Sequence, residues 1–354
     1  MTDEGNGQNR ESPKEPAREG SVGLMEPPVA TTKGDGPPIN GALLLRAGSL
    51  MGFVLVIAYF ALVAPGFLSV GNITNVLEQS AILGVLSFGM TIVMIAGGSN
   101  VITGGIDLSI ANNLGLSAAV YAILLKTGQP DIVALSLTLL TGLAVGLLNA
   151  IAVVSIGILP LIATLTVMNI CAGFELVITQ NTVLQASSPL LAVLAGDGPF
   201  GIATLAYLLL IIGLILIAVI EYTPFGLRLY AVGGFREAAL AAGLSVNRYI
   251  ATSYILSGIC ASIGAVLSVA LLSGSSTGSG DMLLSVVVTA LLGVVFSRRL
   301  VPTISGSLLS VLFIGFLING FQLTNISSYW VNGVEGLLIL FAVATTSLVR
   351  RREA

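Results

Sequence analysis

The chain has 354 residues, of which 55% are hydrophobic and only 9% are charged, and its mean hydropathy is +1.01. This composition excludes a water-soluble globular protein, in which charged residues make up about 25%. The net charge of −3 says little about partners, because it equals the balance of seven acidic and four basic residues within the first 40. Apolar runs of about 20 residues predict an integral membrane protein built from helices, since a β-barrel shows alternating segments of about 10.

Residues 1–40 differ in composition from the rest of the chain. They contain six prolines and few large apolar side chains, so they cannot bury enough surface to become ordered. They also lack the apolar region of a signal peptide. We therefore expect a disordered cytoplasmic tail over residues 1–40 and one transmembrane domain over residues 41–354.

Ten apolar segments follow the tail, and several of them are short or interrupted. They predict an all-α, polytopic membrane protein with about ten transmembrane or partly re-entrant helices and with both termini in the cytoplasm. The segments cover residues 43–64, 76–96, 106–125, 132–154, 159–178, 202–220, 250–272, 282–296, 302–321 and 334–348.

The distribution of positive charge supports this count. With the amino terminus inside, ten spans place nine arginines in the cytoplasm and only Lys126 outside, in agreement with the positive-inside rule. One span fewer or more before Arg228 would scatter the arginines over both faces. The nine are Arg46, Arg228, Arg236, Arg248, Arg298, Arg299, Arg350, Arg351 and Arg352.

Small and amide side chains within the segments are typical of close helix packing. Glycines let two backbones approach each other, and amides form hydrogen bonds between helices. We assign Asn149 and Asn319 to such bonds. The packing glycines are Gly142, Gly146, Gly258 and Gly264.

Two glycine pairs, Gly97-Gly98 and Gly104-Gly105, stand just before the third apolar segment. Paired glycines favour a break in a helix. A broken helix at membrane depth is tolerated only inside the protein or beside a cavity. This region is therefore a candidate wall of a polar pathway.

Five polar residues in or beside the apolar segments are candidates to line or brace that pathway. They are Asp107, Ser109, Asn112, Asn169 and Glu175. Glu175 is the acid lying deepest within a segment, so it needs a partner or a water-filled cavity. Asp107 has an alternative role as a cap at the start of the third helix, where a carboxylate also suits the helix dipole.

The segment over residues 222–249 is the most polar stretch between two apolar spans. It is basic, because Glu237 is its only acidic residue. Residues 236–242 are strong helix formers, Gly243 ends that run, and Ser245 can cap the next helix. This pattern predicts either a plain helical connector or a short docking helix whose charges, Arg236 and Glu237, meet a partner.

Motifs of enzymes are absent from the sequence. There is no Gly-x-x-x-x-Gly-Lys-Ser/Thr phosphate loop, no His-Glu-x-x-His, no Gly-x-Ser-x-Gly and no histidine at all. Cys171 and Cys260 both lie in apolar segments and are expected to be small core side chains rather than a disulfide or metal pair. We expect no enzymatic activity and no cofactor in this chain.

Five stretches of the chain resemble the permease subunits of bacterial ABC importers of the ribose, galactose and arabinose type. They cover most of residues 67–348 and keep the family's order. They read GFLSVGNITNVLEQSAILGVLSFGMTIVMIAGG, GGIDLSIANNLGLSAAV, LPLIATLTVMNICAGFELVIT, TPFGLRLYAVGGFREAALAAGLSVNRYIATSYILSGICASIGAVL and, more weakly, NISSYWVNGVEGLLIL.

The resemblance implies a multi-pass permease in the lipid of the bacterial inner membrane. It implies as partners two cytoplasmic ABC ATPase subunits, which bind the ATP, an extracytoplasmic solute-binding protein and a second permease, identical or related; it implies no nucleic acid. It also implies a helix that couples to the ATPases. That helix is carried over to Gly234, Arg236, Glu237, Ala238, Ala239, Gly243 and Leu244.

Three features depart from the family's pattern. Phe235 follows Gly233-Gly234 where the family usually has asparagine, and residues 99–103 form an apparent insertion. The loop after the eighth segment carries Arg298 and Arg299 instead of glycine pairs, which puts any contact of this loop with the ATPase in doubt.

Together these features predict the translocation subunit of an ATP-driven importer for a monosaccharide or related polyol, working by alternating access. One alternative is an ABC permease for a nucleoside or another small solute. A second is an ion-coupled secondary transporter, which the shortage of paired intramembrane charges disfavours. A third is a membrane scaffold, which the interrupted helices disfavour.

Overall fold

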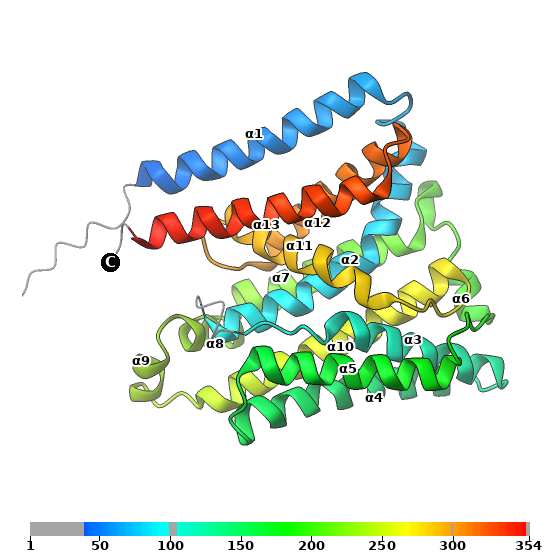
Figure 1. The fold of residues 1–354 in the computed structure, drawn as a ribbon, viewed down its shortest axis with the longest axis horizontal. Coiled ribbons are helices and arrows are strands. Elements are labelled where there is room, and N and C mark those ends of the chain that lie inside the picture. Colours follow the sequence, from blue (N-terminus) through cyan, green and yellow to red (C-terminus); the bar gives the residue numbers. More distant parts are fainter. Residues whose placement is uncertain (1–38, 99–104, 299, 352–354) are drawn as a thin grey trace, which may run out of the picture. The chain divides into compact units, whose positions relative to one another are not determined.

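The computed structural model describes residues 39–98, 105–298 and 300–351, and these residues are mainly helical (Figure 1). A π-helix, Ile151–Ser155, extends α4, and 3₁₀ turns lie at Pro199–Gly201 and Ser279–Met282. Within the described residues, strand pairing is limited to two isolated bridges. The helices are α1 (Ile39–Val63), α2 (Val70–Gly97), α3 (Ile110–Lys126), α4 (Asp131–Ala150), α5 (Pro160–Thr179), α6 (Pro189–Leu194), α7 (Thr204–Tyr222), α8 (Pro224–Gly234), α9 (Arg236–Ala241), α10 (Val246–Leu272), α11 (Leu283–Phe296), α12 (Ile304–Leu323) and α13 (Ser328–Arg351).

Each of the ten predicted apolar segments overlaps one long helix. Among the described residues, seven helices are long and apolar enough to cross a membrane. Shorter apolar stretches lie at Ala47–Val63 within α1, at Ile110–Lys126, which is α3, and at Trp330–Ala344 within α13. The multi-span, all-helical character is therefore confirmed. The count of ten spans and the cytoplasmic side of both termini stay predictions. The predicted tail, up to residue 38, and the 99–103 insertion lie outside the described residues.

Prolines and glycines mark the helix ends. Pro160, Pro189 and Pro224 stand in the first turn of α5, α6 and α8, where a missing N–H costs nothing because that group has no helical partner. At the other end, α2 stops at Gly97, and Gly98 takes a positive φ of 82°. The predicted helix break at this glycine pair is confirmed.

Helix α2 forms the centre of the packed helices. In its most apolar 18-residue window 89% of the residues are buried, against 28% for α5 and α7. It packs on α7, α8, α10, α11 and α12, so it is surrounded by protein. The outer faces of α4, α5 and α7 instead expose leucine, isoleucine and valine, as expected of surfaces that meet lipid or another membrane subunit.

The contact between α4 and α10 is made by glycine. A Cβ on Gly258 would lie 3.0 Å from the Cα of Gly146 and would overlap the carbonyl oxygen of Gly142. A Cβ on Gly146 would lie 3.0 Å from the Cα of Ile255. These three predicted packing glycines therefore join backbone to backbone, as membrane helices do when van der Waals contact drives their association. Gly264 faces side chains instead, with Leu114 3.2 Å from its would-be Cβ.

An amide pair joins α2 to α12. Asn72 Nδ2 donates to Asn319 Oδ1 at 2.8 Å, and Asn319 Nδ2 donates back to Asn72 Oδ1 at 3.0 Å. Both amides are satisfied reciprocally, and so the predicted role of Asn319 as a link between helices is confirmed.

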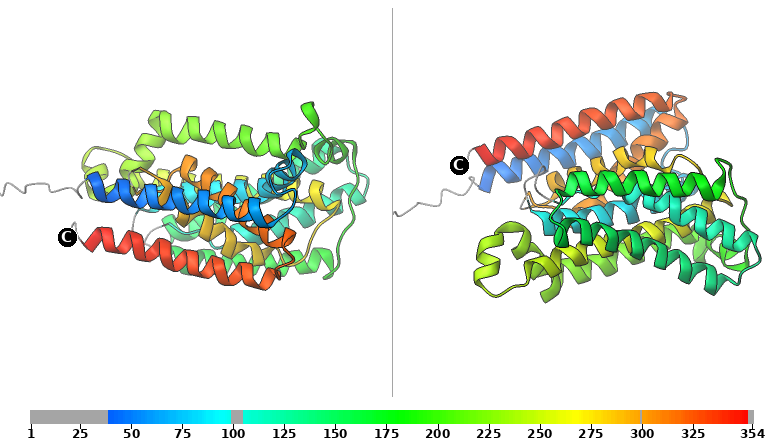
Figure 2. Two further views of the ribbon diagram at one scale, coloured as in Figure 1. Left: turned by 90° about the horizontal axis from the view of Figure 1, so that it is seen from above. Right: turned by 60° about the horizontal axis from the view of Figure 1, so that its bottom comes forward.

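The helix ends are sorted between the two ends of the bundle. The start of α1, the end of α13 and the α8–α9 segment lie at one end, and α6 lies at the other (Figures 1 and 2). This arrangement is the one that the topology prediction requires, because Arg236 belongs to α9 and Asp197 follows α6.

A test of topology uses two single cysteines, Arg236→Cys and Asp197→Cys, in a background with Cys171→Ala and Cys260→Ala. An impermeant thiol reagent applied to intact cells should label position 197 and should reach position 236 only after permeabilisation, because the two lie at opposite ends of the bundle. Labelling of position 236 from outside would contradict the ten-span topology.

Glycine packing makes a second prediction, for Gly258→Ala measured against Gly173→Ala. The new methyl group at position 258 meets the backbone of α4 and should lower the free energy of unfolding by about 1–3 kcal/mol. At position 173 a Cβ meets nothing within 4 Å, so the same change should be neutral or slightly stabilising. Unfolding in mixed detergent micelles measures both, and equal effects would argue against a backbone contact.

Candidate functional site

The α8–α9 segment is built by local sequence signals. Helix α9 ends in a Schellman motif: Leu244 N–H donates to the Ala239 carbonyl at 3.0 Å, and Gly243 N–H donates to the Leu240 carbonyl at 2.9 Å. Gly243 takes a φ of 79°, so the predicted glycine stop is confirmed.

The predicted cap at Ser245 is wrong. Ser245 directly precedes α10 but makes no side-chain capping bond, and its ψ is 80°. Ser69, which does cap α2, has a ψ of 148° and accepts from the N–H of Asn72. The Schellman turn that ends α9 leaves Ser245 with a different backbone conformation, and its carbonyl rather than its hydroxyl accepts the first helical bonds.

The predicted coupling residues divide between surface and interior. Ala239 is 5% exposed, and Leu244 is half-buried. Phe235 and Leu240 are 78% and 56% exposed, although neither was expected to be an apolar surface residue. We call the exposed set the coupling surface: Gly234, Phe235, Arg236, Glu237, Ala238, Leu240 and Gly243.

Beneath the coupling surface lies a small apolar core, which we call the inner cluster. It joins the last turns of α2 and α4 to α8, α9 and the start of α10. Ala239 is the residue that α9 contributes. The inner cluster consists of Val93, Ala150, Val232, Ala239, Val246, Ile250 and Tyr254.

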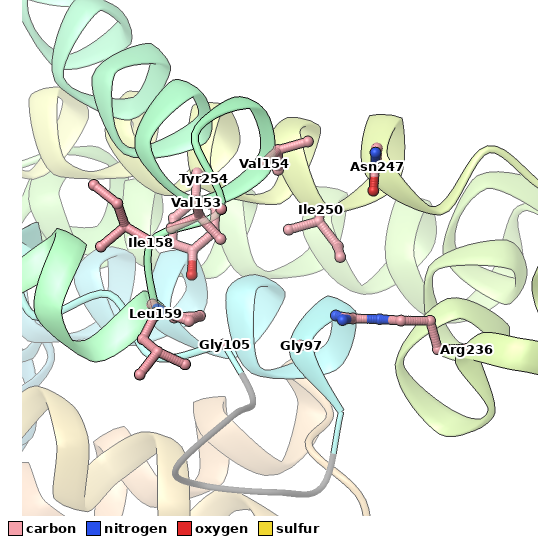
Figure 3. Close-up of a pocket in the computed structure, with 12 residues that line it drawn as sticks. Gly97, Gly105, Val153, Val154, Ile158, Leu159, Arg236, Asn247, Ile250 and Tyr254 are labelled. Atoms are coloured by element: carbon pink, nitrogen blue, oxygen red, sulfur yellow. The ribbon is translucent and has the colours of Figure 1, made fainter.

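A cavity of about 260 Å³ opens beside the inner cluster. Its walls come from the π-helix after α4, the start of α5, the end of α2 and α10. Arg236 extends from α9 toward Gly97 across this cavity, and the Tyr254 side chain points into it (Figure 3). The docking interpretation expected Arg236 to point outward to a partner. In the structure its side chain also lines this cavity.

Asp107 lies at the centre of a polar network that we call the Asp107 node. Its Oδ1 accepts from the Ser109 N–H at 3.0 Å, from Ser109 Oγ at 2.6 Å and from Asn149 Nδ2 at 3.4 Å. Its Oδ2 accepts from Ser257 Oγ at 2.7 Å. Asn149 Nδ2 also donates to Ser109 Oγ at 2.7 Å. All four side chains are buried.

The Asp107 node joins three parts of the chain. Asp107 and Ser109 precede α3, Asn149 belongs to α4 and Ser257 to α10. The bonds come from neutral donors, and bonds of this kind to a carboxylate are stronger than those between neutral groups. Ser109 rather than Asp107 holds the N-cap position of α3, and the Ser109 side chain makes no capping bond. The Asp107 carboxylate does accept the Ser109 N–H just before the helix, which is the kind of bond that the capping interpretation expected. The role predicted for Asn149, a bond between helices, is confirmed.

Glu175 lies apart from the Asp107 node. It is 3% exposed and packs against Gly115 of α3, where a Cβ would lie 2.8 Å from its Cδ. Among the residues that the structure describes, none forms a hydrogen bond with its buried Oε1. The close packing explains how an acid fits between α3 and α5.

The other two predicted pathway residues lie elsewhere. Asn112 is half-buried beside Gly280. Asn169 is exposed on α5, and its amide donates to the Leu165 carbonyl of the same helix at 2.8 Å. The fold therefore brings together Asp107 and Ser109 alone among the five.

Two further buried residues, Ser257 and Glu335, were not predicted from the sequence. Ser257 carries no local signal, because serine is common in close-packed membrane helices. Glu335 is 1% exposed, and its two carboxylate oxygens accept from Ser285 Oγ at 2.8 and 3.0 Å, which joins α13 to α11. An acid next to an apolar run was a usable signal for Glu335, since it is the argument applied to Glu175.

Seven long apolar helices among the described residues, packed around a buried polar node, define the class of polytopic helical membrane proteins. The family model described as the permease component of branched-chain amino acid transport systems matches residues 72–343. The chain belongs to this family of transport permeases, and it is a multi-pass protein of the bacterial inner membrane.

Curated relatives match over most of their length. The ribose import permease protein RbsC of Bacillus subtilis (strain 168) is 33% identical over 85% of this chain and 92% of the relative. The ribose import permease protein RbsC of Escherichia coli (strain K12) is 30% identical over 85% of this chain and 94% of the relative. The L-arabinose ABC transporter permease protein AraH of Azospirillum brasilense is 28% identical over 85% and 87%. No solved structure matches the chain.

The Asp107 node makes a prediction about stability. Asp107→Ala leaves buried donors of Asn149 and Ser257 without an acceptor and should lower the free energy of unfolding by about 1–3 kcal/mol. Asn169→Ala, which removes a bond within one exposed helix turn, should change it by less than about 0.5 kcal/mol. Unfolding in mixed micelles compares the two, and an Asp107→Ala variant as stable as Asn169→Ala would contradict the importance of the node.

Proposed function

We propose that this chain is the translocation subunit of an ATP-driven ABC importer whose solute is a monosaccharide or a related polyol. The relatives named above import ribose or belong to an L-arabinose ABC transporter. Their similarity extends over at least 85% of this chain, so the whole transmembrane domain supports the proposal rather than one motif.

The coupling surface is the observation that carries the proposal. Helix α9 is anchored by one buried alanine, Ala239, and presents Glu237 and Leu240 outward, while the exposed Arg236 extends across the cavity beside it. Together with the exposed ring of Phe235, this gives a short helix with an apolar and charged outer side. Such a helix suits insertion into a groove of a soluble partner. A cytoplasmic ABC ATPase is the partner proposed, and it would bind the ATP.

The polar groups inside the domain suit a solute with hydroxyls and no net charge. The polar side chains bonded to Asp107 in the node are serine and asparagine. A site for a neutral sugar needs a few such hydroxyl and amide groups in apolar surroundings. We assign specificity and high affinity to an extracytoplasmic solute-binding protein, so this chain needs only a path along which the solute binds weakly.

Helix α5 supports a second permease, identical or related, as a partner. Its exposed face carries Thr166 and Asn169, whose side chains bond to carbonyls of their own helix. Gly173, one turn after Asn169, has open space where a side chain would stand. Small and polar residues on one face favour close approach of another membrane helix over contact with lipid.

The proposed mechanism is alternating access. Closure of two ATPase subunits on ATP pushes α9 of each permease. The two permeases then approach each other at one membrane face and separate at the other. The chain carries out no covalent step, and the energy comes from the partner subunits.

The test is uptake by proteoliposomes that contain this chain with the ATPase encoded beside it. With ATP enclosed and the solute-binding protein outside, labelled ribose, arabinose or a polyol should accumulate, because hydrolysis drives the cycle. An imposed ion gradient without ATP should give no uptake. Uptake that follows the ion gradient, or that requires an amino acid or nucleoside as solute, would overturn the proposal.

Glu237→Arg supplies the matched variant for this test. It reverses a charge on the coupling surface and should abolish ATPase co-purification and uptake while insertion stays normal, since surface substitutions change stability by less than about 0.5 kcal/mol. Lys126→Glu reverses an exposed charge on the last residue of α3, away from the coupling surface, and should behave like the wild type.

A further inference from the structure

The last turn of α2 touches α8 through bare backbone. A Cβ on Gly233 would lie 3.2 Å from the backbone nitrogen of Gly98 and would overlap the carbonyl oxygen of Ile95. In return, a Cβ on Gly98 would overlap the carbonyl oxygen of Gly233 and lie 3.6 Å from its Cα. The two backbones are therefore in direct contact, with no side chain between them.

The same turn of α2 touches the segment that leads into the Asp107 node. A Cβ on Gly105 would lie 2.9 Å from Cγ1 and 3.0 Å from the carbonyl carbon of Val93, and would overlap the Val93 carbonyl oxygen. Gly105 stands two residues before Asp107, whose carboxylate is bonded to α4 and α10. One helical turn thus contacts both α8 and the segment of the node.

These two contacts lie on different sides of a rigid element. Val93 and Ile95 are two residues apart, and such positions on an α-helix are separated by about 200° around its axis. Val93 is 0% and Ile95 3% exposed. A close-packed helix with buried flanks cannot absorb a push on one side by local rearrangement, because packed interiors transmit strain.

Helices α8 and α9 are joined tightly enough to move together. Phe235 N–H donates to the Ala231 carbonyl of α8 at 3.2 Å, and the Phe235 carbonyl accepts from the Ala239 N–H of α9 at 2.9 Å. Val232 and Ala239 also share the inner cluster. A force on the coupling surface therefore reaches Gly233, one residue after Val232.

We propose that Gly233 is a positioning residue that passes displacement of α8 and α9 to the Asp107 node through the last turn of α2. The inference rests on the proposed function, because it takes the ATPase as the source of the displacement. It adds a specific mechanical route, which runs from α9 through Gly233, Ile95, Val93 and Gly105 to Asp107. Without a side chain at Gly233, α8 and α2 keep one fixed separation, so a movement of one must move the other.

Gly233→Ala is the variant that tests this route in the full assembly. The added methyl group pushes α8 away from α2 without changing any residue of the coupling surface. ATPase co-purification and basal hydrolysis should stay near wild type, while uptake and solute-stimulated hydrolysis should fall about tenfold, within the range by which residues on a coupling route change coupling. Gly71→Ala, at the other end of α2 where a Cβ meets nothing within 4 Å, should match the wild type.

A thiol reporter distinguishes transmission from simple packing. Val154→Cys places a thiol on the cavity wall formed after α4, in the Cys171→Ala and Cys260→Ala background. Its rate of modification should change when ATP binds to the otherwise wild-type assembly, and Gly233→Ala should abolish that change. A residue that only packs would lower the yield of assembly and leave the ATP dependence in the folded fraction.

Three outcomes would contradict the route, and a fourth would contradict the proposed function instead. Normal stimulated hydrolysis in Gly233→Ala, or a loss of all activities in proportion to yield, contradicts transmission through Gly233. An ATP-independent rate at Val154→Cys in the otherwise wild-type assembly contradicts it even if Gly233→Ala fails to insert. If the wild-type chain binds no ATPase, the proposed function fails and the glycine contact is not at issue.

Discussion

A carboxylate inside a membrane protein must be held by donors, and Asp107 obtains them from three separate parts of the chain. An intramembrane acid is costly to leave unpaired, so Ser109, Asn149 and Ser257 must stay within bonding distance of it. That requirement fixes where α3 begins and holds α4 and α10 beside it. The glycine contact between α4 and α10 lies beside this node, because Gly258 directly follows Ser257 and Gly146 stands about one turn before Asn149.

The end of the bundle that carries α9 depends on this arrangement. The inner cluster takes residues from the ends of α2 and α4 and from the start of α10, the helices that the Asp107 node and the central packing position. Helix α9 has only six residues, too few to be stable alone. It persists because Ala239 is buried in the inner cluster and because Gly243 closes its last turn. A short helix held in this way can present a constant surface to a partner.

Much of the fold could be predicted from the sequence, because its main signals are local. Apolar runs gave the long helices, and glycine at position 243 gave the end of α9. The positions of side chains around each helix were harder to predict. From Ala81 onward helix α2 is almost wholly apolar on all sides, so no periodicity indicates what each face contacts. The partners of Asp107 stand 42 and 150 residues away in the chain, and no local pattern connects them.

The errors have the same origin. Asp107 has the right residue type and place for a cap, but bonds to α4 and α10 set its orientation. Ser245 also has the right type, yet the turn before it sets an unsuitable ψ. Asn169 and Glu175 lie in one segment, but α5 turns the first outward and the second inward, and a pathway role for either of them stays a prediction. In each case tertiary contacts or backbone geometry decided what composition alone left open.

The backbone contact between α4 and α10 has a consequence for how this chain can change over evolutionary time. Gly142, Gly146 and Gly258 bring the two helices into backbone contact, and this contact does not rely on the shape of large neighbouring side chains. Flanking positions can then exchange one aliphatic residue for another while the two helices stay in register. A scaffold joined in this way tolerates extensive drift, and this accords with relatives that share only 28–33% of their residues over nearly the full length.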